Sequence, residues 1–155
     1  MNWKAEAMDK LRCYDAMQRS LQNIPQEITR LKAESAALGS GVSLCPVGSR
    51  DIRRKEDALL DNMVKRQELQ WSLEQVQSWT QTVNRALSGL DPEERLILHQ
   101  LYILPQTGAV ENLMEKLGVE KSSIYRRRDK ALRKFTMCLY GEEASKDCGW
   151  AYYGK

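Results

Sequence analysis

Residues 117–128 read Leu-Gly-Val-Glu-Lys-Ser-Ser-Ile-Tyr-Arg-Arg-Arg, and they predict a tight turn followed by a basic helix. The glycine at 118 suits such a turn, because glycine adopts backbone conformations that strain other residues. Apolar residues recur at helical spacing on both sides of the turn. The pattern predicts a short helix over about 109–117 and a longer helix over about 121–140.

The longer helix has two chemically different faces. Its inner face is expected to be apolar and consists of Ile124, Ala131, Leu132, Phe135 and Leu139. Its outer face is polar and mostly basic, with Lys121, Ser122, Tyr125, Arg126, Asp129, Lys130 and Arg133. A short helix, a glycine turn and a basic second helix are typical of a helix-turn-helix, whose second helix lies in the major groove of DNA.

The charge is concentrated around this second helix. The whole chain has a net charge of +3, whereas residues 119–140 hold seven basic and two acidic side chains, a net charge of +5. A dense basic cluster indicates a polyanionic partner, although a solvated helix face would have a similar composition. The glycine turn beside the cluster favours the DNA interpretation.

A further helix is predicted just before the two helices of the turn. Asp91 can cap it, Pro92 fits its first position and Glu94 can complete a capping box. The helix continues over Arg95 to Ile103. Residues 88–140 are therefore expected to form a DNA-binding module with its own apolar core.

Residues 1–87 predict a long antiparallel helical hairpin that resembles a coiled coil, with a loop at 39–50. Apolar residues follow a 4,3 spacing over 3–38 and again over 52–87. Each arm has 36 residues and is roughly 54 Å long. Pro25 is expected to kink or break the first arm. The predicted fold class is thus all-α, a hairpin followed by the helix-turn-helix module.

Leu60, Val64 and Trp71 lie off the seam of the second arm, on nearly the opposite face. Scattered apolar residues on a surface are ordinary. A two-helix hairpin buries little on its own, however, and this favours a homodimer through the N-terminal helices.

Three segments, 90–98, 117–128 and 130–135, resemble the fourth conserved region of bacterial sigma factors, and the resemblance covers about residues 88–136. With the long helical N-terminal part, the chain is similar to the phage-encoded sigma-like late transcription regulators of the RinA and ArpU type. The resemblance implies DNA recognition by the second helix, with Lys121, Ser122, Tyr125 and Arg126 facing the groove. The wider set of expected DNA-binding residues is Lys121, Ser122, Ser123, Tyr125, Arg126, Arg127, Arg128, Lys130 and Arg133.

Three residues depart from the sigma pattern. Met114 stands where a small residue is usual, which would separate the two helices. Arg127 replaces an apolar residue, so it is expected either to contact phosphate or to bury its aliphatic stem. Glu120 is a poor N-cap, although its charge suits a helix N-terminus.

Other function classes find no support in the sequence. The four cysteines and the single histidine, His99, have no metal-ligand spacing, and no phosphate loop or activated nucleophile is visible. We therefore expect no enzyme activity, cofactor or metal. No apolar run approaches the roughly 20 residues that span a bilayer, and the N-terminus does not look like a leader. The expected location is therefore the cytoplasm of a bacterial host, on the nucleoid when DNA is bound.

The predicted function is sequence-specific regulation of transcription, as an activator of phage late genes that binds upstream promoter DNA and contacts RNA polymerase. Two alternatives remain: a small terminase subunit for DNA packaging, and a coiled-coil adaptor protein. A ring of many copies would indicate the terminase. Residues 141–155 form an aromatic C-terminal tail that either frays or docks on another surface.

Overall fold

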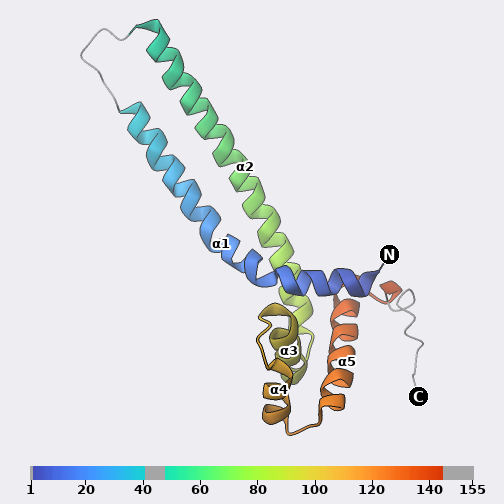
Figure 1. Ribbon diagram of the computed structural model, residues 1–155. Helices are drawn as coiled ribbons and strands as arrows, with labels where there is room; N and C mark the ends of the chain where they lie inside the picture. The colour runs from blue at the N-terminus through green and yellow to red at the C-terminus, as the bar shows by residue number, and fades with distance from the viewer. Residues whose placement is uncertain (1, 41–47, 145–155) are drawn as a thin grey trace. The chain divides into compact units, whose positions relative to one another are not determined.

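The computed structural model describes residues 2–40 and 48–144 and contains only helices in these ranges, which confirms the all-α fold class. The helices are α1 (Trp3–Gly39), α2 (Ser49–Ser88), α3 (Pro92–Leu98), η1 (His99–Ile103), α4 (Ala109–Leu117) and α5 (Lys121–Tyr140) (Figure 1). The chain divides into two compact units. Unit 1 combines residues 1–17 with residues 79–155, and unit 2 is Gln18–Ser78.

Unit 2 consists of parts of two long helices, which lie side by side and run in opposite directions (Figure 1). Ile28, Leu31 and Leu73 are buried between them. Asn62 is also buried, and its Nδ2 donates a hydrogen bond to the backbone oxygen of Leu31 at 2.9 Å. A buried polar residue in such a seam fixes which turns of the two helices face each other.

The long helix α1 passes through Pro25 without a break. The break considered from the sequence is therefore not found. The Thr29 hydroxyl donates a hydrogen bond to the backbone oxygen of Pro25, at a distance of 2.9 Å. The end of α1 at Gly39 agrees with the sequence. Residues 41–47 of the expected loop lie outside the described residues.

Unit 1 has a core to which the first turns of α1 contribute. Ala7 and Leu11 of α1 are fully buried there. They pack with residues from α2, η1 and α5, namely Val83, Ala86, Ile103, Ala131, Leu132 and Phe135. The sequence placed residues 1–87 in one part and residues 88–140 in another, whereas the compact units combine the two ends of the chain.

One ring contact and one hydrogen bond extend this core. The Trp3 and Tyr140 rings have centroids 4.7 Å apart, and the Tyr14 hydroxyl donates to Asn84 Oδ1. Both contacts join α1 to a helix distant in the sequence. They extend the packing of the first α1 turns to the C-terminal end of α5 and to α2.

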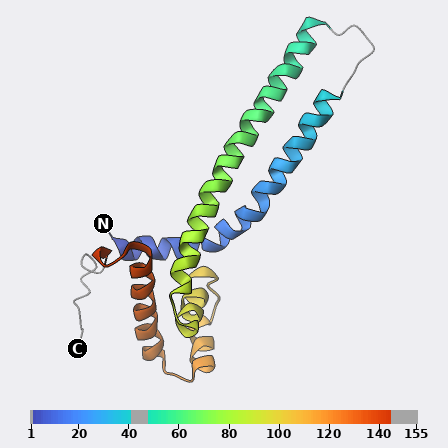
Figure 2. The same ribbon diagram turned by 180° about the vertical axis from the view of Figure 1, so that it is seen from behind.

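A second, smaller cluster joins α3, α4 and α5, which lie together in both views (Figure 2). Ile97, Leu113 and Ile124 are fully buried in it. Partly buried apolar residues surround them: Leu96, Leu101, Val110, Met114, Leu117 and Val119. Met114, where the sigma pattern has a small residue, thus packs in this cluster.

The helix predicted from Pro92 to Ile103 begins at Pro92, as expected, but its winding changes after Leu98. A capping box starts α3 at Pro92, where the Asp91 backbone N–H donates to Glu94 Oε2 at 3.0 Å. After Leu98 the backbone continues as the π-helical turn η1. The bounds of α4 and α5 are those that the sequence predicted.

Candidate nucleic-acid interface

The turn between α4 and α5 depends on the backbone of Gly118. This residue has φ +62° and ψ +36°, and its N–H donates to the backbone oxygen of Met114. A Cβ on Gly118 would meet no atom within 4 Å. The left-handed backbone, and not a lack of space for a side chain, is therefore what requires a glycine here.

Replacing Gly118 with alanine should destabilise unit 1 by about 1–2 kcal/mol, because alanine is strained in the left-handed region. Gly118→Asn is the matched control and should cost less, since asparagine tolerates this backbone. Urea denaturation of both variants measures the difference. Equal free energies of unfolding for Gly118→Ala and the unchanged chain would contradict the assignment.

The basic helix α5 begins with little help from its capping residue. Glu120 is the N-cap, with an extended backbone and no side-chain hydrogen bond to the first turn. This agrees with the sequence, where Glu120 was a poor cap. Lys121 and Ser122, which follow it, are exposed. The first backbone N–H groups of α5 therefore lack a side-chain acceptor from the N-cap, and such groups can bind an anion.

The outward face of α5 carries Ser122, Arg126 and Lys130, spaced four residues apart and all exposed. Four-residue spacing places side chains on one face of a helix. Within the described residues, Arg126 and Lys130 make no ion pair. Arg133 continues the same face and is half-buried. On this face, Arg126 and Lys130 thus present a guanidinium and an ammonium group that make no ion pair among the described residues and are available to an external anion.

Two arginines of the predicted set are engaged inside unit 1 instead. Arg127 is half-buried and forms an ion pair with Glu93 of α3. Arg128 pairs with Asp129 at 2.8 Å, and its guanidinium carbon lies 5.1 Å from the centre of the Tyr125 ring. To contact DNA, either arginine would have to exchange these partners. Ser123 is half-buried, and Tyr125 is 37% exposed at the side of the face.

Lys134 was not among the predicted site residues, yet it ties α5 to the start of α3. Its Nζ lies 3.0 Å from Glu94 Oε2 and 3.4 Å from Asp91 Oδ2. Glu94 is buried and also closes the capping box, so one carboxylate serves both contacts. The sequence shows the acidic residues at the start of α3. It does not show that Lys134 pairs with Glu94, because the two are 40 residues apart in the chain.

The raised pKa values of two side chains in unit 1, Tyr140 and Lys134, predict that the protein loses stability at alkaline pH. Burial raises the pKa of the Tyr140 phenol above its ordinary value of 10.0, and Glu6 adds to the effect. The hydrogen bond to Glu94, with that to Asp91, raises the pKa of Lys134 above 10.5. Because the folded state holds both protons more tightly, their contribution is complete below pH 10 and is lost as the pH rises through the raised pKa values.

We therefore expect the Tm to fall when the pH is raised from about 8 to about 11. The fall should be smaller in Tyr140→Phe, which lacks the phenol proton. Thermal melts followed by circular dichroism measure it. Equal slopes of Tm against pH in the unchanged chain and Tyr140→Phe would contradict the role of Tyr140.

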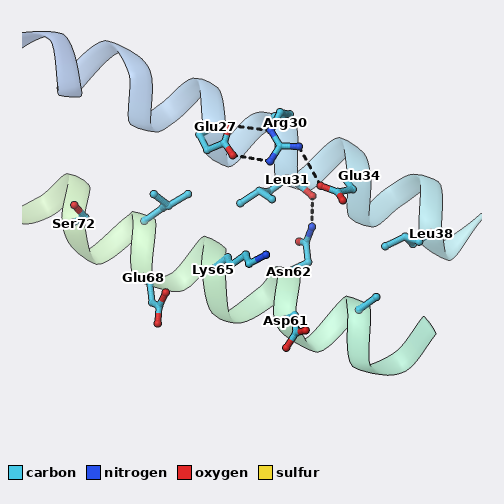
Figure 3. Close-up of a pocket in the computed structure, with 12 residues that line it drawn as sticks. Glu27, Arg30, Leu31, Glu34, Leu38, Asp61, Asn62, Lys65, Glu68 and Ser72 are labelled. Atoms are coloured by element: carbon cyan, nitrogen blue, oxygen red, sulfur yellow. Dashed lines mark hydrogen bonds and ion pairs between the residues drawn. The ribbon is translucent and has the colours of Figure 1, made fainter. Parts of the chain in front are cut away.

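Unit 2 has a groove of its own, between α1 and α2 (Figure 3). Its walls carry more acidic than basic residues: Glu27, Glu34, Asp61 and Glu68 stand against Lys65 and Arg30, and Arg30 is held by Glu27 and Glu34. Acidic walls repel phosphate, so this groove does not suit nucleic acid. Among the described residues, no group of His, Cys, Asp and Glu side chains could hold a metal ion.

No known protein family, curated protein or solved structure matches this chain. None of the helices in the described ranges is long and apolar enough to cross a membrane.

Proposed function

We propose that the protein is a sequence-specific DNA-binding regulator of transcription that reads duplex DNA with α5. The observation that carries the proposal is the face with Ser122, Arg126 and Lys130, which is exposed and whose two basic residues have no ion-pair partner among the described residues. It follows directly on a left-handed glycine turn that joins α5 to the short helix α4. Together these elements have the layout of a helix-turn-helix.

Each group on this face has a suitable chemistry. A guanidinium such as that of Arg126 can bind guanine O6 and N7 in the major groove with two hydrogen bonds, while a hydroxyl such as that of Ser122 can bond any base. Lys121 and Lys130 suit phosphates on either side. Arg127, held by Glu93, and Lys134, held by Glu94, fix α5 against α3 instead. We assign them to positioning the helix.

The sigma-like resemblance adds the biological setting. It supports a role as an activator of phage late genes, which works on the nucleoid in the bacterial cytoplasm and contacts RNA polymerase near the promoter. A small terminase subunit would also bind DNA, but it would assemble into a ring of many copies. Light scattering of the full chain distinguishes the two assignments.

The proposal is tested by immunoprecipitating the protein from cells that produce it and sequencing the bound DNA. We expect a few sites upstream of genes, which share one sequence. The control is Arg126→Ala with Lys130→Ala, which should lose these sites while the protein remains folded. Enrichment at no site, or the same sites with the double variant, would refute recognition by α5.

A further inference from the structure

One face of α2 in unit 2 exposes large apolar side chains. Leu60 is 58% exposed, Met63 56%, Val64 54% and Trp71 65%. With Gln67 they recur at intervals of three or four residues over three turns, so they line one face of the helix. Asn62 and Leu73 point into the seam with α1, which lies on nearly the opposite face. We call the residues 60, 63, 64, 67 and 71 the outer stripe.

The outer stripe has the features of a contact surface. Val64, Gln67 and Trp71, with Glu68 and Ser72, line a shallow groove. Contiguous apolar surface of this kind marks interaction sites on otherwise polar proteins. Tryptophan is also the residue type most enriched among those that dominate binding energy. An exposed Trp71 in the middle of a polar helix therefore suggests a site for a partner side chain.

The residues beside the outer stripe are acidic. Residues 56–78 contain Glu56, Asp57, Asp61, Glu68 and Glu74, against only two basic residues. Of those two, Arg66 is half-buried, and Lys65 is exposed and lines the groove toward α1 together with Asp61 and Glu68. Over residues 56–78 the charges beside the outer stripe are thus mostly negative, and the basic residues Arg53, Arg54 and Lys55 lie before this stretch.

This charge distribution determines the occupant. A second copy of the same face would bring carboxylates against carboxylates, and like charges across an interface oppose binding. A helix with an apolar ridge and flanking Lys or Arg would pair with the carboxylates, and its cations could stack on Trp71. The outer stripe is about 17 Å long, which matches about three helical turns.

We propose that the outer stripe of α2 docks a basic amphipathic helix of a different protein. This surface goes beyond the proposed DNA recognition and is independent of it, because it lies in unit 2 and uses none of the α5 residues. The homodimer expected from Leu60, Val64 and Trp71 becomes the alternative that the test must exclude. A small interface suffices for a regulator, since two proteins bound to the same DNA meet at a high effective concentration.

The test uses the full chain and two stapled helical peptides of about three turns with the same apolar ridge, one flanked by Lys and Arg and one by Glu. Fluorescence anisotropy of the labelled peptides measures the affinities. The basic peptide should bind at least about tenfold more tightly than the acidic one, and Trp71→Ala should weaken it by about tenfold or more. Asp61→Lys with Glu68→Lys should reverse the preference. Glu115→Lys on α4, a single charge reversal at another exposed site, should leave it unaltered.

Three results would overturn the inference. One is equal affinity for the two peptides, and another is a preference that survives the double charge reversal. The third is a full chain that is dimeric at micromolar concentration and becomes monomeric in Trp71→Ala, since a second copy then occupies the surface. Because all the substituted side chains are exposed, unchanged circular dichroism spectra verify that the variants fold. DNA binding should persist in every variant, so a failure here is distinguishable from a failure of α5.

Discussion

Replacing Leu11 with alanine is expected to lower the free energy of unfolding of unit 1 by about 2–5 kcal/mol, the range found for buried leucines. Leu11 is fully buried among Val83, Leu132 and Phe135, so its removal leaves a cavity in the core beneath α5. Leu60→Ala is the matched control. Its side chain is 58% exposed, so the same substitution should change stability little. Urea denaturation followed by circular dichroism measures both variants.

The same packing predicts that residues 86–140 do not fold alone. A fragment of this length would lack Ala7, Leu11 and Val83, and Leu132 and Phe135 would face water. The sequence had suggested a self-contained module over 88–140. Adding residues 2–17 as a separate peptide to a fragment of residues 79–144 should restore helical structure. A folded fragment of 86–140, or a Leu11→Ala variant as stable as the Leu60→Ala control, would contradict this assignment of the core.

The second large effect concerns DNA affinity. Arg126→Ala should weaken binding to the preferred duplex by about 1–3 kcal/mol if the guanidinium reads a base. The fold should be unaffected, because the side chain is exposed and has no ion pair among the described residues. Lys130→Ala should weaken binding to all sequences alike and reduce the salt dependence by about one unit of slope, as expected for a phosphate contact.

Arg12→Ala is the control, since Arg12 is an exposed arginine on α1 that pairs with Asp9. It should have a far smaller effect than Arg126→Ala. Affinities from fluorescence anisotropy at several salt concentrations separate the base contact from the phosphate contact. An Arg126→Ala variant that binds as tightly as Arg12→Ala would remove Arg126 from the interface.

The sequence predicted the local elements well because their signals are local. The apolar spacing on either side of Gly118 predicts the bounds of α4 and α5, and Asp91 with Glu94 predicts the start of α3. In each case a few neighbouring residues decide the backbone conformation. The left-handed φ of Gly118 likewise depends on the glycine itself, so the turn could be predicted from the sequence.

The sequence could not show which surfaces meet. The 4,3 spacing of α1 predicts a buried face, but it does not say that Ala7 and Leu11 face α5 while Leu31 faces another part of α2. The ion pair of Arg127 with Glu93 also joins residues that are distant in the sequence. The sequence alone therefore predicts Arg127 as a DNA contact. Residues 145–155, which include most of the aromatic tail, lie outside the described residues.

The central claim is that α5 recognises a particular DNA sequence, and selection of duplexes from a random library by the full chain tests it most directly. The account predicts that a single sequence is enriched over successive rounds, and that Arg126→Ala relaxes the preference at one base pair of that sequence. Binding of all duplexes alike, or an enriched sequence that is identical for the Arg126→Ala variant, would contradict base recognition by α5.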